Sequence, residues 1–193
     1  MARGSADFKS IHKKVLKTEK FQNAAYLSAK LKYTTAKKMF FNEFLSHPVT
    51  KEIRSGPDSS NISGTLGGYG NLFSFLGFEG DRNPVEEIVE AMQSLFSFRK
   101  SKDSPGNISF EITYPDIDKL KPFSSLSWAF GGSWVSGIER GIPNFAQYLS
   151  DEDILNSRSG SGIQVKGVLR GVNFKAVPYL TPILRKFKER IEK

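Results

Sequence analysis

The sequence predicts an α+β fold in which a long N-terminal helix and a C-terminal helix pack on a small, mainly antiparallel sheet. Three observations lead to this prediction: residues 8–45 lack both proline and glycine, short strand-like segments follow, and the C-terminal segment is amphipathic. With 38% hydrophobic and 25% charged residues, the 193-residue chain has enough apolar content for a packed core. We expect a single domain overall, with a basic helical arm over residues 1–54 and an α+β body over residues 55–193.

The long helix is expected over residues 8–45, either continuous or interrupted near residues 34–35. Its end is marked by His47 and Pro48, because the residue before a proline avoids helical geometry. A short turn should follow, up to Ile53. The apolar face of the helix has the i, i+3, i+4 spacing and comprises Ala36, Met39, Phe40 and Phe44.

The segment over residues 63–80 is the most distinctive part of the chain. It holds six glycines and lacks a base or a cation, with Glu79 only at its edge. Residues 58–70 are expected to form a polar loop, and residues 72–78 a strand that is buried on at least one face. Glycine gives the backbone freedom and aromatic residues bury large areas, so the segment is more typical of an assembly element than of a reaction centre. Its large apolar residues are Leu72, Phe73, Phe75, Leu76 and Phe78.

A second helix is expected to begin at Asn83 and Pro84, because Asn is a good N-cap and Pro fits the first helical position. Arg99 and Lys100 are expected near its C-terminal end, where basic residues are favourable. Its apolar face comprises Val85, Ile88, Val89, Met92, Leu95 and Phe96.

The elements that follow are shorter. Residues 108–113 alternate between apolar and polar, which predicts a half-buried strand, and residues 163–169 are expected to form another strand. Residues 115–127 read as a proline-bounded loop and residues 134–140 as a short helix or bend. Between this short helix or bend and the strand at residues 163–169, we expect a helical turn over residues 143–149 and a polar loop over residues 151–162.

The last helix is expected to begin at Thr181 and Pro182, which form a strong N-cap signal. Its apolar residues recur at helical spacing with basic residues between them. They are Ile183, Leu184, Phe187 and Ile191.

The sequence lacks the residues that several kinds of catalytic and binding site require. The chain has no cysteine, which excludes disulfides, thiolate zinc sites and cysteine nucleophiles. Its two histidines, His12 and His47, have no second ligand at metal-binding spacing. No phosphate-binding loop motif occurs, and the Gly68-Tyr69-Gly70 run has Phe73 where a dinucleotide fingerprint needs its last glycine. We therefore expect no cofactor and no enzyme.

Two acidic clusters keep a metal-dependent enzyme open as a minor alternative. One holds Asp116 and Asp118, and the other spans residues 151–153. Neither continues into a calcium loop with a closing Glu, so solvated loop acids are the favoured interpretation. No stretch approaches the ~20 apolar residues that a membrane-spanning helix needs, and the N-terminus lacks the apolar region of a signal peptide.

The positive charge gathers at one end of the chain. Residues 1–54 hold 12 Lys or Arg and 4 Asp or Glu, whereas residues 55–193 hold 16 of each class. A basic arm on a neutral body indicates either contact with DNA or an acidic partner, or simply a solvated helix face. Any contact with DNA should be non-specific, because the arm lacks a pattern for reading bases. The candidate contact residues are Lys9, Lys13, Lys14, Lys17, Lys20, Lys30, Lys37 and Lys38, and Lys32 belongs to the same arm.

Three segments in fixed order carry a resemblance. They are SGTL at residues 63–66 after the lysine- and alanine-rich helix, WVSGIERG at residues 134–141, and VPYLTPIL at residues 177–184. Together they resemble the neck, or tail-completion, minor structural proteins of long-tailed bacteriophages, which show TG-x-L, Y-A-x-x-V-E-x-G and P-F-L-x-P-A. This chain departs from that pattern with Ser63, with Trp134 for the aromatic Tyr, and with Tyr179 for Phe.

The resemblance implies a ring-forming structural protein between the portal vertex and the tail tube, located in the virion, assembled in the host cytoplasm and without catalysis. Its partners would be copies of itself and other neck, connector and tail proteins, and it would have no small-molecule substrate and no membrane contact. Trp128 and Trp134 flank Gly131-Gly132 and belong either to the core or to an interface. The candidate interface residues are Leu66, Tyr69, Phe73, Phe75, Trp128, Trp134, Glu139, Arg140 and Tyr179.

Two other functions remain open from the sequence. One is a different tail or baseplate component. The other is a non-specific nucleic-acid-binding protein that uses the basic N-terminal helix.

Overall fold

A computed structural model of the chain describes residues 14–66, 70–101, 107–126, 132–140 and 176–192. The helices are α2 (Glu19–Ser46), α3 (Pro48–Arg54), α4 (Leu72–Phe75), α5 (Pro84–Leu95), α6 (Ile117–Leu120), α7 (Trp134–Arg140) and α9 (Leu180–Glu192), with a 3₁₀ turn, η1 (Lys121–Phe123). The strands are β1 (Ser97–Lys100) and β2 (Phe110–Thr113), which pair antiparallel with Ser97 opposite Thr113. The predicted fold class is confirmed: α2 packs against α9, and the described residues contain a two-stranded antiparallel sheet.

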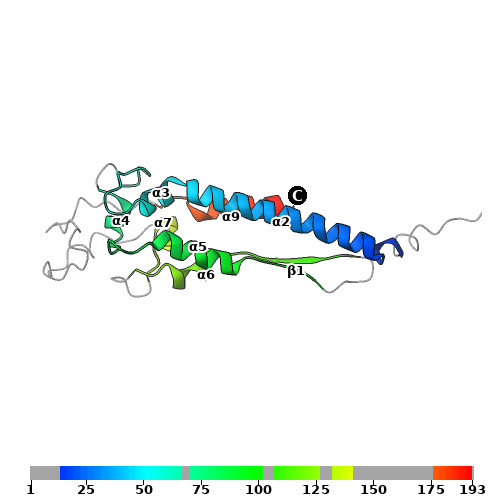
Figure 1. The fold of residues 1–193 in the computed structure, drawn as a ribbon. Helices are drawn as coiled ribbons and strands as arrows, with labels where there is room; N and C mark the ends of the chain where they lie inside the picture. Colours follow the sequence, from blue (N-terminus) through cyan, green and yellow to red (C-terminus); the bar gives the residue numbers. More distant parts are fainter. Residues whose placement is uncertain (1–13, 67–69, 102–106, 127–131, 141–175, 193) are drawn as a thin grey trace, which may run out of the picture.

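The described part of the molecule is elongated (Figure 1). Helix α2 lies along one side with α9 against it, while α5 and α6 lie along the other side. The β1–β2 hairpin continues from α5 beside the N-terminal half of α2. Aromatic rings fasten it there: Phe98 stacks on Phe110 at 5.4 Å between ring centroids and on Tyr33 at 5.4 Å, and Tyr26 lies 5.6 Å from Phe98.

The long helix ends where the sequence predicted. Helix α2 runs without interruption through residues 34–35, so the break considered there does not occur. At its end the backbone N–H of His47 donates to the carbonyl of Phe44. The same residue starts α3, because its Nδ1 accepts a hydrogen bond from the backbone N–H of Val49 at 3.3 Å. The turn expected up to Ile53 is therefore the helix α3, with Pro48 at its first position.

The strand expected over residues 72–78 is wrong, because Leu72–Phe75 forms the single-turn helix α4. Asn71 caps this helix by accepting a hydrogen bond from the backbone N–H of Ser74 at 2.9 Å. Gly77 follows with φ of 68°, a left-handed conformation that favours glycine and stops the helix. A short apolar run fits a buried helix as well as a strand, and here the cap and the glycine decide.

Three other parts of the secondary structure differ from the prediction. Arg99 and Lys100 do not end α5, which stops at Leu95, but belong to β1. Helix α9 begins one residue before Thr181. The region predicted as a proline-bounded loop contains α6 and η1. The elements predicted over residues 143–169 lie outside the described residues.

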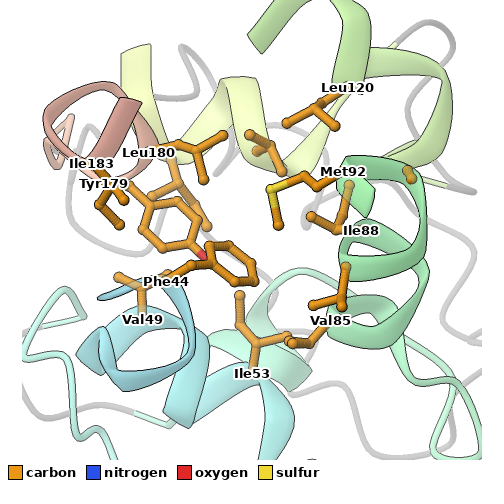
Figure 2. Close-up of a cluster of buried hydrophobic side chains, with 14 of the residues drawn as sticks. Phe44, Val49, Ile53, Val85, Ile88, Met92, Leu120, Tyr179, Leu180 and Ile183 are labelled. Carbon is orange, nitrogen blue, oxygen red and sulfur yellow. The ribbon is translucent and has the colours of Figure 1, made fainter. Parts of the chain in front are cut away.

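The core joins both ends of the chain. Phe40 of α2, Phe96 after α5 and Phe187 of α9 are buried, and each pair of rings meets edge to face, with centroids 5.1 to 6.0 Å apart. Figure 2 shows the neighbouring part of this core, where side chains of α2, α3, α5 and α9 point toward one another. The α2–α9 contact also carries an ion pair, in which Arg190 donates to the carboxylate of Glu43. The division at residue 54 stays a prediction, although the C-terminal half of α2 shares this core with the body.

Candidate assembly interface

A buried carboxylate holds the glycine-rich loop to α3. Glu52 has no exposed surface, and its Oε2 accepts from the backbone N–H of Ser63 at 2.6 Å while its Oε1 accepts from that of Leu72 at 2.7 Å. Both oxygens thus bind backbone donors from the two ends of one loop. Asn71 adds a third tie by donating to the carbonyl of Pro57 at 2.5 Å. The loop that contains the first motif is therefore fixed by side chains rather than by strand pairing.

The third motif inserts an aromatic side chain into the core. Tyr179 is fully buried, and its hydroxyl lies 2.6 Å from Oγ1 of Thr50 on α3. Its ring lies 5.8 Å from that of Phe44 and 4.9 Å from that of His47. Burial raises the pKa of Tyr179, so the phenol is neutral and contributes one satisfied polar atom to the core.

Glu139 of the second motif connects directly to the third. Its Oε1 accepts hydrogen bonds from the backbone N–H of Leu180 and, at 2.6 Å, from that of Thr181. These N–H groups start α9, where no carbonyl of the helix is available for them and where negative charge is favourable. The backbone N–H of Val177 also donates to the carbonyl of Ile138 at 2.9 Å. The two motifs therefore form one unit that positions the C-terminal helix.

Trp134 fills the space between the motifs. It is fully buried, its ring lies 6.0 Å from Phe78 and 6.5 Å from Tyr179, and its backbone N–H donates to the carbonyl of Ser124 at 2.8 Å. Its indole nitrogen has no hydrogen-bond partner among the described residues. The three motifs thus meet around α3 and α7, a region that we call the motif junction: Thr50, Glu52, Ser63, Trp134, Glu139 and Tyr179.

The structure places the candidate interface residues at different depths. Phe73, Trp134 and Tyr179 are buried within the single chain. Leu66 and Phe75 are partly buried against the same core, and Glu139 is partly exposed. The exposed Arg140 lies 3.5 Å from Asp118. Tyr69 and Trp128 lie outside the described residues. An interface role for these residues stays a prediction, and the geometry gives the buried ones a packing role.

The basic arm is largely accessible. Lys14, Lys17, Lys20, Lys30 and Lys38 are exposed, whereas Lys9 and Lys13 lie outside the described residues. Lys37 differs from them, because its Nζ lies 5.1 Å from the ring centroid of Phe96 and 6.0 Å from that of Phe41. Burial lowers the pKa of Lys37. Its side chain thus covers the aromatic core and is less available to an external anion than the others.

The acidic pair Asp116 and Asp118 has structural partners. Asp116 caps α6 by accepting from the backbone N–H of Lys119 at 2.8 Å, and this bond lowers the pKa of its carboxyl group. Asp118 pairs with Lys121 at 2.8 Å, which lowers its pKa as well. Among the described residues no group of three or more His, Cys, Asp or Glu is placed to hold a metal ion.

None of the described helices is long and apolar enough to cross a membrane.

Sequence reasoning missed two features. Glu52 and Thr50 gave no signal, because their partners are distant along the chain. The second feature is an apolar stripe on the solvent side of α2, where Leu27 is 64% exposed and Leu31 is 68% exposed. Their i, i+4 spacing, which repeats on the side away from the buried face, was a readable signal.

His47, whose ring lies beside that of Tyr179, gives the stability of the folded chain a pH dependence. Burial lowers its pKa, and the nearby carboxylate of Glu139 offsets part of this effect. The unfolded state therefore binds a proton near pH 6.5 while the folded state does so only at lower pH. The contribution of neutral His47 to the free energy of unfolding is therefore complete above about pH 6.5. It is lost as the pH falls toward the pKa of His47 in the folded state.

We expect His47→Asn to reduce the loss of unfolding free energy between about pH 7.5 and about pH 5.5, because Asn keeps the helix cap but does not titrate. Denaturant unfolding at the two pH values measures the change. An unchanged difference between the two pH values in the variant would contradict the role of His47.

No protein-family model matches the chain, and no curated protein and no solved structure is similar to it.

Proposed function

We propose that the chain is a non-enzymatic virion structural protein at the head–tail connection of a tailed phage. It would form a ring that links the connector to the tail. The observation that carries the proposal is the motif junction: the second and third segments that resemble neck proteins contact each other through Glu139, and the first and third segments both bond to helix α3, at Glu52 and Thr50. Residues that resemble a family motif and hold one another in place are expected when the motifs encode one structural unit.

The chemistry of these residues supports a structural role. Both oxygens of Glu52 and Oε1 of Glu139 accept hydrogen bonds from backbone N–H groups, and the Tyr179 hydroxyl is buried against Thr50. Groups engaged in this way position chain segments, whereas a general base needs access to a substrate proton. The proposed partners are copies of the same chain and neighbouring neck, connector and tail proteins, and the proposed location is the virion.

A non-specific DNA-binding function is the second candidate, and the exposed lysines of α2 favour it. Phosphate contacts made by such lysines would be sensitive to salt, because bound counterions are released. A tail or baseplate component stays open as an alternative within the structural class.

Sedimentation of the purified chain over a range of concentrations, with and without duplex DNA, separates the two candidates. The proposed function is expected to give a discrete oligomer that forms without DNA. A chain that stays monomeric, and whose affinity for DNA falls steeply between low and physiological salt, would favour the second candidate.

A further inference from the structure

Helix α2 carries a second face that the described residues of the chain leave uncovered. Residues at alternating three- and four-residue spacing, the pattern of a helix–helix seam, are all exposed. Two leucines lie in the middle of this face, and lysines lie at both ends. We call it the outer seam: Lys20, Ala24, Leu27, Leu31, Thr34 and Lys38.

The outer seam lies away from the core. The buried residues of the same helix are Tyr33, Ala36, Phe40 and Phe44, which face α9, Phe96 and the hairpin. By the 100° rotation per residue of an α-helix, Leu27 and Leu31 point to the opposite side. Leu27 is 64% exposed and Leu31 is 68% exposed, one helical turn apart, so together they form a contiguous apolar patch on this face.

Charge disfavours the pairing of this seam with itself. Whether two copies of α2 met parallel or antiparallel, lysine ends would lie against lysine ends, and such like-charge contacts are unfavourable. A complementary surface would present carboxylates together with apolar surface.

The opposite side of the same molecule presents that chemistry. Residues 79–95, which include α5, hold five acidic residues and one arginine. Arg54 and Arg82 pair with Glu86 and Glu87, whereas Asp81 and Glu90 form no ion pair with any described residue. Beside them lies an open cleft of about 480 Å³, lined by Arg82, Glu87, Glu90, Ala91, Pro122 and the exposed Phe123, among others. We call this the acidic face.

We propose that the outer seam of one copy packs on the acidic face of the next copy, with a seam leucine entering the cleft beside Phe123. The two surfaces lie on opposite sides of the molecule, as α2 and α5 do in Figure 1. A contact between different surfaces repeats head to tail, which is the type of contact that builds a ring. The inference rests on the proposed function, because it assigns the contact between subunits of that ring.

Charge reversal tests the contact in the full chain. Lys20→Glu with Lys38→Glu is expected to weaken self-association about tenfold or more, because carboxylates would then face carboxylates. Adding Asp81→Lys and Glu90→Lys to the same chain is expected to restore association. The matched control is Lys32→Glu with Lys51→Glu, which changes the charge equally off the seam and is expected to associate like the wild type. Sedimentation gives the association constants, and circular dichroism checks that each variant is folded, since all these side chains are exposed.

Each result decides for or against the contact. Loss in the seam variant with recovery in the four-residue variant supports it. Association of the seam variant equal to that of the control overturns this contact while leaving ring formation intact, so the proposed function is not affected. Loss without recovery also overturns it, and if DNA binding is lost in parallel, the seam binds nucleic acid instead. A wild-type chain that does not associate overturns it too, whereas its copy number in particles still tests the proposed function.

Discussion

Replacing Trp134 with alanine is expected to lower the free energy of unfolding of the isolated chain by about 3–5 kcal/mol. The side chain is fully buried between Phe78 and Tyr179, so its removal leaves a large cavity where the second and third motifs meet. Domains of this size are stable by only about 5–15 kcal/mol, so the variant should melt at a much lower temperature. Denaturant unfolding followed by circular dichroism measures the change.

Two further variants sharpen this test. Trp134→Phe is expected to cost less than Trp134→Ala, because it keeps most of the apolar volume and removes an indole N–H that has no partner among the described residues. Ile62→Ala, at a side chain that is 50% exposed, should stay within about 0.5 kcal/mol of the wild type. If Trp134→Ala keeps full stability and loses only self-association, its side chain belongs to an interface and the packing role is wrong.

Replacing Glu52 with alanine is expected to cost about 2–5 kcal/mol, because the backbone N–H groups of Ser63 and Leu72 lose their acceptor in a buried position. The loop between these two residues should then open more often than in the wild type. Hydrogen exchange of residues 57–72 measures the opening, and denaturant unfolding measures the overall loss.

The carboxylate itself is tested by Glu52→Gln, which keeps one acceptor oxygen but places an amide NH₂ against the other backbone donor. We expect a loss smaller than that of the alanine variant. Glu111→Ala, on the exposed side of β2, is the control and should leave loop exchange unchanged. Equal exchange of the loop in the wild type and in Glu52→Ala would show that the carboxylate does not hold it.

Local signals in the sequence predicted the helices that have clear boundary residues. Asn83 and Pro84 start α5, and His47 with Pro48 ends α2, because capping and the geometry of proline act within a few residues. The alternation before Tyr114 likewise predicted β2. Its partner β1 was missed because Arg99 and Lys100 resemble the basic end of a helix, whereas pairing with β2 determines their conformation.

The motif junction could be predicted only in part. The motifs identified Trp134, Glu139 and Tyr179 as a group, but not whether they lie in the core or on the surface. The role of Glu52 could not be predicted, because its hydrogen-bond partners lie 11 and 20 residues away along the chain. The same holds for the hydrogen bonds of Glu139, whose partners lie 41 and 42 residues away. Contacts of this kind depend on how the helices pack, which no local propensity encodes.

The most direct test of the proposed function is quantitative mass spectrometry of purified virus particles from the culture that produces this chain. It is paired with negative-stain imaging of particles made without the chain. A connector ring predicts a low, fixed copy number per particle and, in its absence, heads and tails that are complete but not joined. Absence of the chain from purified particles would contradict the proposal and would leave nucleic acid as the target of the basic helix.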